Sequence, residues 1–361
     1  MSIAMSGVQR AALACEERCR DAVARRAPMA EWRGAQERIT ALRERMRGRF
    51  VDRDEAIDGI LASLVSRAGC VLLGPPGTAK SMLVRAIAED CRLITEGDDA
   101  NYFEYLLTAH TMPEEVFGPT DVAKLLAAEP VVERRTRGRL PAAEIAFLDE
   151  VFRGGSHILN ALLTILNERR YHNGRAIERV PLIGFIGAAN HPPHTEELKA
   201  FFDRFPVRVW VESVLKTGSG DDEIERRAAK LVQASSMSIT GFRGGTRAEL
   251  LPSPEDFRYL WSKVHIELGM PQPGNQRFAE YVGAFRQLQS IGGLSDRAFV
   301  QLWYFAGALD LLSGRPTHLS YAEGGRGHFD CFKFTAPTLE ASRNVVFQVD
   351  CLSADAHATG N

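Results

Sequence analysis

The chain has 361 residues, enough for two folded units, and its 45% hydrophobic and 25% charged residues are ordinary for a soluble globular protein. The net charge of −2 gives no overall attraction to nucleic acid or to an anionic membrane, and six cysteines without a Cys-x-x-Cys pair argue against a disulfide scaffold or a structural zinc site. Because the sequence has no charged leader before an apolar stretch and no apolar run of about 18 residues, we expect neither a signal peptide nor a membrane span, and a cytoplasmic protein.

The first 47 residues have a helix-forming composition, and we expect a helical N-terminal extension of two helices separated at Pro28. Arginines and glutamates alternate there, which favours a solvated helical face over a nucleic-acid-binding arm. A further amphipathic helix is expected over residues 50–67, because apolar residues recur there at helical spacing.

A glycine-rich loop, residues 74–81, follows a short apolar strand at residues 71–73. Successive backbone N–H groups and the N-terminus of the next helix would point at one place, which favours anionic oxygens. In such a phosphate-binding loop Lys80 reaches the β- and γ-phosphates and the Ser81 hydroxyl holds Mg²⁺. Ala79 stands where the usual pattern has Gly, so the signature is one residue short.

A second strand is expected at residues 102–107, followed by a short helix that ends at Gly118. Residues 120–143 are less regular, and residues 134–139 form a basic, glycine-containing stretch that predicts a hairpin turn. Two interpretations of that stretch stay open, a solvated loop and a loop that reaches a central pore or a partner.

The strand expected at residues 144–148 ends in Asp149 and Glu150, about 70 residues after the loop. At this end of a strand in a phosphate-loop fold, Asp149 would hold Mg²⁺, mostly through water, and Glu150 would polarise the attacking water. The predicted nucleotide-binding residues are Gly74, Pro75, Pro76, Gly77, Thr78, Ala79, Lys80, Ser81, Met82 and Asp149, with Ser81 and Asp149 as the metal ligands.

A helix at residues 158–169 leads into an Asn173-Gly174 pair, the strongest short-range signal for a β-hairpin. The next buried strand, residues 182–190, ends in Asn190, which either orients the attacking water or only caps the strand. A last strand is expected at residues 207–211.

The composition shifts over residues 216–250, where flexible ends flank a helix at 223–235, and we place a domain boundary there. We expect a nucleotide-binding domain at residues 48–215, this linker, and an α-helical domain with a C-terminal tail at residues 251–361. Its helices are expected to begin at Ser253 and to cover residues 276–291 and 297–312.

The order of these motifs resembles that of the AAA+ ATPases of the MoxR group, and within that group it is most similar to RavA-like proteins. Ala79 also occurs in RavA-like proteins at the position where other phosphate loops have Gly. The segments that carry the likeness are Phe103-Glu104-Tyr105-Leu106, Pro113-Glu114-Glu115-Val116-Phe117-Gly118-Pro119, Phe147-Leu148-Asp149-Glu150, Asn167-Glu168-Arg169 and Asn173-Gly174.

The resemblance implies an α/β fold, an AAA+ phosphate-loop NTPase with a parallel-sheet core and a smaller α-helical lid domain. It assigns Asn190 as sensor 1, Arg204 as the arginine finger that enters the neighbouring subunit's site, and Arg297 as sensor 2 on the lid. Together with Glu150 and Lys80, these three are the predicted catalytic residues. Residues 120–140 match the helix-2 insert and residues 170–180 the hairpin before sensor 1, both expected to face the pore of a ring.

The resemblance therefore implies a homo-oligomeric ring, expected to be a hexamer, that uses ATP and Mg²⁺ to remodel or chaperone a protein client. On the same ground we expect a partner with a von Willebrand factor A domain. The alternative is a motor that acts on nucleic acid, which the basic stretch at 134–139 could support and the net charge of −2 disfavours. A third alternative, a scaffold that binds ATP and barely hydrolyses it, is disfavoured because such a scaffold does not need Glu150.

Overall fold

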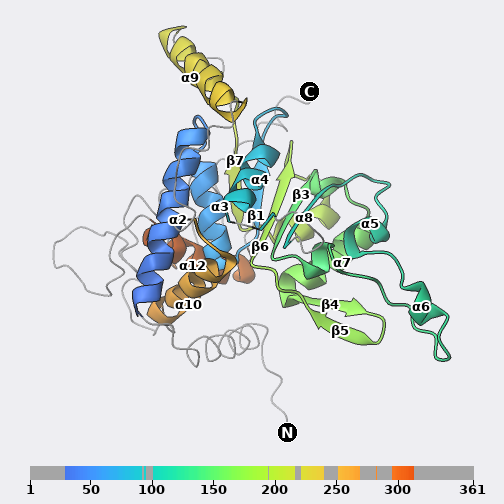
Figure 1. The fold of residues 1–361 in the computed structure, drawn as a ribbon. Coiled ribbons are helices and arrows are strands. Elements are labelled where there is room, and N and C mark those ends of the chain that lie inside the picture. The colour runs from blue at the N-terminus through green and yellow to red at the C-terminus, as the bar shows by residue number, and fades with distance from the viewer. Residues whose placement is uncertain are drawn as a thin grey trace.

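The computed structural model describes residues 29–91, 93–94, 101–193, 195–215, 221–239, 251–268, 282 and 295–312 (Figure 1). The first predicted N-terminal helix, the C-terminal tail and, apart from residue 282, the predicted helix at 276–291 lie outside the described residues. None of the helices within those ranges combines the length and the apolarity that crossing a bilayer requires.

Five parallel strands form the central sheet, in the spatial order β2-β3-β6-β1-β7 (Figure 1). Because all five run in the same direction, their carboxyl ends meet at one edge of the sheet and their amino ends at the other. The predicted parallel-sheet α/β core is confirmed. The strands are β1 (Cys70–Leu73), β2 (Tyr102–Leu106), β3 (Ile145–Asp149), β6 (Gly184–Ala189) and β7 (Val207–Trp210).

Strand β1 shows why this segment takes the centre of the sheet. All four of its residues are buried, and their side chains alternate between the two faces. Cys70 and Leu72 join the core on one face, and Val71 and Leu73 join the core on the other. An uninterrupted apolar run is what a parallel strand covered on both faces requires. Burial raises the pKa of the Cys70 thiol to about 12.

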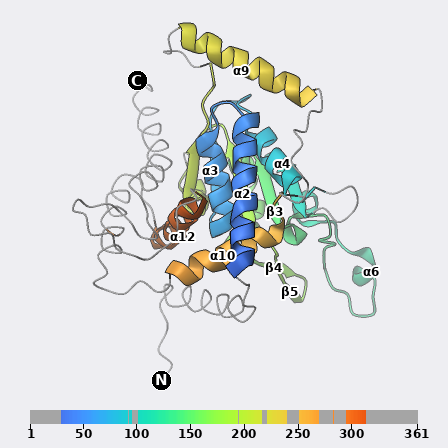
Figure 2. The same cartoon turned by 60° about the vertical axis from the view of Figure 1, so that its left-hand side comes forward.

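Helices cover both faces of the sheet, as the two views show (Figures 1 and 2). One face carries α2 (Met29–Arg49), α3 (Asp54–Ser66), α4 (Lys80–Asp90), α10 (Pro254–Leu268) and α12 (Asp296–Leu312). The other carries α5 (Pro113–Phe117), α7 (Ser156–Glu168) and α8 (Glu196–Phe202). The remaining elements are α6 (Val122–Leu125), the 3₁₀ turns η1 (Leu140–Ala142) and η2 (Val151–Arg153), the hairpin strands β4 (Arg170–Asn173) and β5 (Ala176–Arg179), and α9 (Asp221–Ile239).

Helix α2 is an integral part of one core. It buries an apolar stripe, Ala35, Ile39, Leu42 and Met46, against its neighbours. Its arginines reach carboxylates of other helices: Arg43 bonds Asp58 of α3 at 2.6 Å and Arg45 bonds Asp90 of α4 at 2.7 Å. The predicted solvated face is confirmed in part: Arg33, Glu37 and Glu44 are exposed, whereas Arg43 and Arg45 pair with helices distant in sequence. The helix also runs across residue 47, and the domain boundary predicted there stays a prediction.

Helices α10 and α12 are tied to the amino-terminal edge of the sheet. Arg258 of α10 forms an ion pair with Glu144, which directly precedes β3. Ser295, which directly precedes α12, donates a 2.7 Å hydrogen bond to Asp203, ahead of β7. The described helices of the predicted lid thus lie at the edge opposite the carboxyl ends of the strands (Figure 2).

Two extensions project together from the body of the protein (Figure 1). One is the predicted Asn-Gly hairpin, which the structure confirms as antiparallel β4 and β5. The other is a loop at residues 120–139 that contains α6. The basic stretch at 134–139 was predicted to form a hairpin turn, but it is not the tip of a hairpin. Arg134 instead pairs with Thr120 at the base of the loop and forms an ion pair with Glu114.

Candidate nucleotide-binding site

The glycine-rich loop leaves the carboxyl end of β1 and enters α4. Gly74 has φ of 144°, and a Cβ atom there would lie 2.2 Å from the carbonyl oxygen of Val211, so only glycine fits beside β7. Gly77 has φ of 78° and Ala79 φ of 64°, both in the left-handed region. The left-handed backbone at position 79 explains why phosphate loops usually have glycine there. This chain has alanine at that position instead. Met82, the last loop residue predicted to contact nucleotide, is exposed.

Lys80 is buried and curls back over the loop. Its Nζ atom donates to the carbonyl oxygens of Gly74 at 2.7 Å and Pro75 at 2.9 Å. Burial lowers the pKa of Lys80, while the charges of Asp149 and Glu150 oppose that shift. A desolvated ammonium group held by neutral oxygen atoms can exchange those bonds for stronger ones to phosphate oxygens.

Ser81 and Asp149 bring a hydroxyl and a carboxylate together. The Ser81 hydroxyl donates to Asp149 Oδ2 at 2.7 Å, and the backbone N–H of Glu150 donates to Oδ1 at 2.9 Å. Hard oxygen ligands of this kind suit Mg²⁺, which in NTPase sites binds one or two protein ligands together with substrate phosphates and water. The described part of the chain has no cluster of three or more His, Cys, Asp or Glu side chains that could hold a metal without such help.

Glu150 and Asn190 meet across two neighbouring strands. The Asn190 Nδ2 group donates to Glu150 Oε1 at 2.7 Å, and Arg153 lies 3.3 Å from Oε2 of the same carboxylate. Glu150 itself has φ of 50°, a left-handed conformation that is uncommon outside glycine. The structure therefore places the predicted water-polarising carboxylate and the predicted sensor in direct contact. The sequence did not reveal Arg153, because nothing in its spacing distinguishes it from a surface arginine.

Arg204 and Arg297 are not brought to this site. The carbonyl oxygen of Arg204 lies beside Gly69, at the amino end of β1, whereas the phosphate loop starts at its carboxyl end. At about 3.3 Å per residue, the five residues from Gly69 to Gly74 separate the two edges by roughly 16 Å. The side chain of Arg297 donates to Asn167 Oδ1 at 2.6 Å, at the end of α7.

The two arginines instead share one electrostatic environment. Burial lowers the pKa of Arg297, and the nearby positive charge of Arg204 lowers it further, while Asp203 opposes both effects. Arg204 itself forms a 2.9 Å ion pair with Asp203 and keeps 22% of its side chain exposed. Arg204 and Arg297 are therefore close enough for each to feel the other's charge, and both lie away from the phosphate loop.

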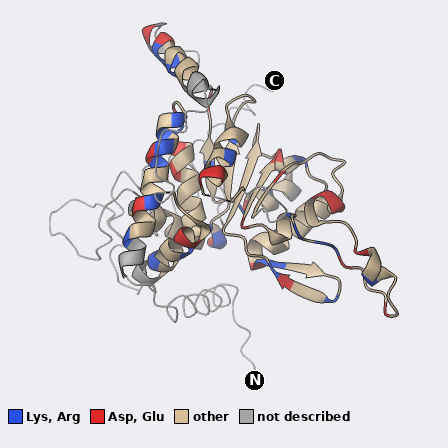
Figure 3. Cartoon of the chain, in the orientation of Figure 1, with Lys and Arg blue, Asp and Glu red and all other residues tan. Residues whose placement is uncertain are grey.

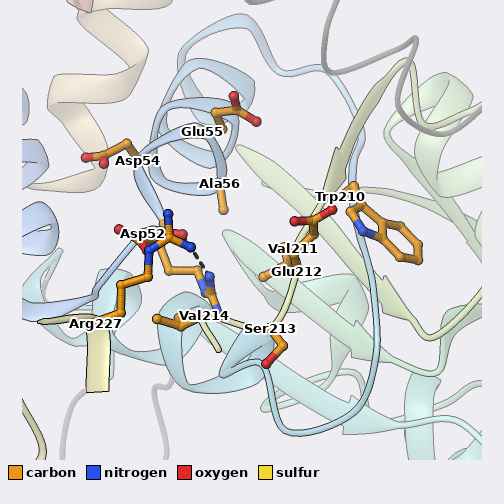
Figure 4. Close-up of a pocket in the computed structure, with 11 residues that line it drawn as sticks. Asp52, Asp54, Glu55, Ala56, Trp210, Val211, Glu212, Ser213, Val214 and Arg227 are labelled. Carbon is orange, nitrogen blue, oxygen red and sulfur yellow. Dashed lines mark hydrogen bonds and ion pairs between the residues drawn. The ribbon is translucent and has the colours of Figure 1, made fainter. Parts of the chain in front are cut away.

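A pocket next to the phosphate loop was missed by the sequence analysis. It has a cavity volume of about 400 Å³ and lies between the start of α3 and the segment after β7 (Figure 4). Arg227 of α9 reaches over it to Asp52, 3.4 Å away. The pocket is lined by Asp52, Arg53, Asp54, Glu55, Ala56, Trp210, Val211, Glu212, Ser213, Val214 and Arg227. These segments are distant in sequence, so no local pattern could have identified the pocket.

Arg53 joins the pocket to the phosphate loop. Its side chain is buried, and Nε donates to the carbonyl oxygen of Thr78 at 3.2 Å. Burial lowers the pKa of Arg53, with the charge of Asp52 opposing the shift. Arg53 therefore braces the loop from the side of the pocket.

Comparison with known families identifies the family to which this phosphate-loop site belongs. Residues 37–223, just over half of the chain, match the family model described as the MoxR domain in the MoxR-vWA-β-propeller ternary systems. The chain belongs to this MoxR family. The matched MoxR domain starts within α2 and includes the phosphate loop, Asp149, Glu150, Asn190 and Arg204.

Three curated relatives extend the comparison. The MoxR chain is 48% identical over 177 residues to the uncharacterised protein MJ0079 of Methanocaldococcus jannaschii, covering 49% of this chain and 44% of that protein. It is 49% identical over 176 residues to MJ0812 of the same organism, covering 49% of this chain and 45% of that protein. It is 26% identical over 290 residues to the structural protein ORF618 of Acidianus two-tailed virus, covering 75% of this chain and 46% of that protein. The chain spans less than half the length of these relatives.

Among solved structures, a proposed ATPase from Cytophaga hutchinsonii shares the fold with a TM-score of 0.56. The match covers 87% of both chains at 14% identity, and at that identity it concerns the fold alone. The predicted AAA+ fold class of this MoxR protein is confirmed.

Proposed function

We propose that this MoxR protein hydrolyses ATP in the presence of Mg²⁺. One observation carries the proposal: at one edge of the sheet, Lys80, the Ser81–Asp149 pair and the Glu150–Asn190 pair converge around the phosphate loop. Lys80 would contact the β- and γ-phosphates, and the open pocket lined by Arg53 and Trp210 would take the nucleoside.

Each side chain of the site would have a separate role in phosphoryl transfer. Ser81 and Asp149 would hold Mg²⁺, which when bound offsets negative charge on phosphate oxygens. Glu150 would orient the attacking water and accept a hydrogen bond from it, and Asn190 would hold that carboxylate in place. Such reactions depend on positioning and electrostatics more than on covalent chemistry, which suits a site whose members already contact one another.

We further propose that the site is completed by a neighbouring copy of the chain. Arg204 and Arg297 cannot reach the phosphate loop of their own chain, yet they lie together at the opposite edge of the sheet. An arginine supplied in trans raises the rate of phosphoryl transfer by about 10³–10⁵. A head-to-tail contact that presents both arginines to the next phosphate loop closes into a ring, which we propose to be a hexamer.

The ring would use ATP hydrolysis to remodel a protein partner, in the manner of RavA-like proteins. The matched family is described from systems that combine MoxR, vWA and β-propeller components, and this supports a von Willebrand factor A domain protein as the partner. The exposed apolar residues on the loop at 120–139, among them Leu126 and Val132, offer a surface for such a protein.

The alternative of a nucleic-acid motor has less support. Arginines are interspersed with glutamates along α2 (Figure 3), and Arg43 and Arg45 of α2 pair with carboxylates. In the loop at 120–139, Arg134 and Arg135 pair with Glu114 and Asp121. Paired arginines leave little free charge for a phosphate backbone.

The test is the steady-state release of phosphate from ATP by the full chain with Mg²⁺, across a range of protein concentrations. Glu150→Gln keeps the size of the side chain and removes its charge, so turnover should fall by at least about 100-fold while nucleotide binding persists. Glu255→Gln, an exposed carboxylate on α10, is the matched control and should hydrolyse like the parent. Equal turnover by Glu150→Gln and the parent would rule out this function.

A further inference from the structure

One buried side chain, Asn173, makes the closest bonds between the two projecting elements, and Thr136 of the insert adds a 3.3 Å hydrogen bond to Glu178 of the hairpin. The insert is defined as residues 120–139, and the hairpin as β4 and β5 with their turn. Asn173 ends β4 and is only 3% exposed, although a turn asparagine needs no burial. A buried polar side chain requires partners, and those of Asn173 lie mainly in the insert.

Asn173 satisfies its side-chain amide with three hydrogen bonds. Its Oδ1 atom accepts from the backbone N–H of Arg134 at 2.7 Å, and its Nδ2 atom donates to the carbonyl oxygen of Arg134 at 2.9 Å. The second Nδ2 hydrogen goes to Glu178 Oε1 at 2.6 Å, within the hairpin. Because a primary amide carries the same donor and acceptor as a peptide group, Asn173 pairs with Arg134 as a neighbouring strand residue would.

The backbone of Arg134 is oriented for this pairing. In the antiparallel bridge between Arg134 and Thr120, the hydrogen bonds run from Asp121 N–H to Glu133 O and from Arg135 N–H to Pro119 O. The N–H and C=O groups of Arg134 itself are therefore left for the hairpin. Asn173 extends the small ribbon of the insert by one residue.

Close packing also holds the hairpin against the insert. Gly174 has φ of 61°, and a Cβ atom there would lie 2.5 Å from Glu133 Cγ and 2.8 Å from Val131 Cγ1, so the hairpin turn sits directly on the insert. An exposed ion pair between Arg175 and Glu129 joins the same two elements at 3.3 Å. Exposed pairs of that kind contribute little.

The hairpin lies between two members of the candidate site along the chain. Glu150 precedes it through η2 and α7, and Asn190 follows it through β6. The insert lies between β2 and β3 and is itself continuous with the site through β3, which ends at Asp149. A change at the Glu150–Asn190 contact reaches the hairpin from both of its ends along the chain, and Asn173 bonds the hairpin to the insert.

We propose that Asn173 is a positioning residue that makes the insert follow the hairpin when the nucleotide site changes state. The proposal rests on the proposed ATPase function for the source of that change. It assigns the coupling between hairpin and insert to one buried side-chain amide, whose bonds to Arg134 cannot be replaced by alanine.

The experiment is hydrogen–deuterium exchange of the full chain, read by mass spectrometry on peptides from the insert and from the hairpin. The parent, Asn173→Ala and Arg175→Ala are compared without nucleotide, with Mg-ADP, and with a slowly hydrolysed ATP analogue. Arg175→Ala is the matched control, because it removes a contact between the same elements at the surface. Melting temperature and basal ATP hydrolysis are measured on the same samples.

In Asn173→Ala we expect the rate of amide exchange in the insert to rise by about tenfold or more without nucleotide. The variant loses the buried hydrogen bonds to Arg134, and the loss of each should account for a large part of that increase. The parent and Arg175→Ala should show insert and hairpin responding together to the ATP analogue, whereas in Asn173→Ala only the hairpin should respond. Basal hydrolysis should stay within about twofold of the parent.

A second design guards against loss of folding. Asn173→Asp leaves two carboxylates facing each other, the new one and that of Glu178, and should loosen the insert at least as much as alanine. Adding Glu178→Gln supplies a donor, so the carboxylate introduced by Asn173→Asp can accept from both the Arg134 N–H and the new amide. Exchange in the insert should then return part of the way toward the parent, because the Arg134 carbonyl oxygen still lacks the donor that Asn173 supplies. That rescue would not occur if the substitutions merely unfolded the hairpin.

Three results would overturn the proposal: unchanged exchange in the insert of Asn173→Ala, a nucleotide response of the insert in that variant equal to the parent's, or no response of either element in the parent. A parent that does not hydrolyse ATP contradicts the proposed function separately. In that case the exchange measured without nucleotide still tests whether Asn173 holds the insert against the hairpin.

Discussion

The Ser295 hydroxyl donates a 2.7 Å hydrogen bond to the carboxylate of Asp203, and Asp203 in turn holds the guanidinium group of Arg204 at 2.9 Å. The residue directly before α12 thereby fixes the carboxylate that orients Arg204. The helical C-terminal part and the segment before β7 act as one support for this arginine.

Removing that support should lower activity more than stability. We expect Ser295→Ala to cost about 1–2 kcal/mol of unfolding free energy, because the hydroxyl both bonds Asp203 and accepts from the Ala298 N–H at the start of α12. ATP turnover should fall several-fold at saturating ATP, because Arg204 loses a fixed orientation. Ser262→Ala, which removes a hydroxyl bonded to a carbonyl within α10, is the control in urea unfolding and in turnover. Equal turnover by the two variants would show that Asp203 needs no help from α12.

Asn190 should affect the chemical step rather than binding. In Asn190→Ala the Glu150 carboxylate keeps Arg153 as its partner and loses the 2.7 Å bond that positions it. We expect kcat to fall by about 10- to 100-fold, as for a misplaced general base, with nucleotide affinity within a few-fold of the parent. Steady-state kinetics and titration with a fluorescent ATP analogue measure the two quantities. A loss confined to affinity would instead assign Asn190 to nucleotide binding.

Two inactive variants should restore each other when mixed. Arg204→Ala has an intact phosphate-loop half of the site, and Glu150→Gln has an intact arginine half. After mixed assembly at equal amounts, about a quarter of the contacts unite the two intact halves, so turnover should recover to about a quarter of the parent's. Phosphate release from the mixture, compared with each variant alone, measures this. No recovery in a mixture shown to co-assemble would contradict a shared site.

Replacing Ala79 by Gly should stabilise the protein. Ala79 adopts φ of 64°, which costs a residue with a Cβ atom about 1–2 kcal/mol. Against this gain, glycine lowers the stability by about 0.4–1 kcal/mol, because it gives the unfolded chain more conformational freedom than alanine does. The net expected gain is about 0.5–1 kcal/mol in chemical unfolding. Ala161→Gly in α7, where the backbone is right-handed, should instead destabilise by about 1 kcal/mol.

The buried thiols should resist alkylation. Burial raises the pKa of Cys70 to about 12 and raises that of Cys91 as well, and both side chains are inaccessible. At pH 8 the reactive thiolate form is therefore nearly absent, and iodoacetamide should modify these two residues only when the protein unfolds. Peptide mass spectrometry with and without urea measures this. Rapid labelling of Cys70 in the native protein would show that β1 opens.

The local parts of the fold were predictable from sequence, because they depend on short patterns. The apolar run at β1, the loop around Lys80 and the Asn173-Gly174 hairpin lie where their patterns put them. The convergence of Asp149 and Asn190 also follows, since carboxyl ends of parallel strands share an edge.

Packing between distant segments was not predictable. Helical periodicity identified α10 and α12 but contains nothing about the edge of the sheet on which they dock, which depends on contacts such as Arg258 with Glu144. The burial of Asn173 was missed for the same reason, because its partner Arg134 lies 39 residues away in an irregular loop. The catalytic roles of Asn190, Arg204 and Arg297 stay predictions.

The proposed division of the site between neighbouring chains has a consequence for the number of complete sites. Each chain has one phosphate-loop edge and one arginine edge, so an open string of n chains completes n − 1 sites, and a closed circle completes n. Short open strings would therefore be disproportionately inactive, and a lone chain would have no complete site. Turnover per chain, measured across assembly sizes, then reports the closure of the assembly itself.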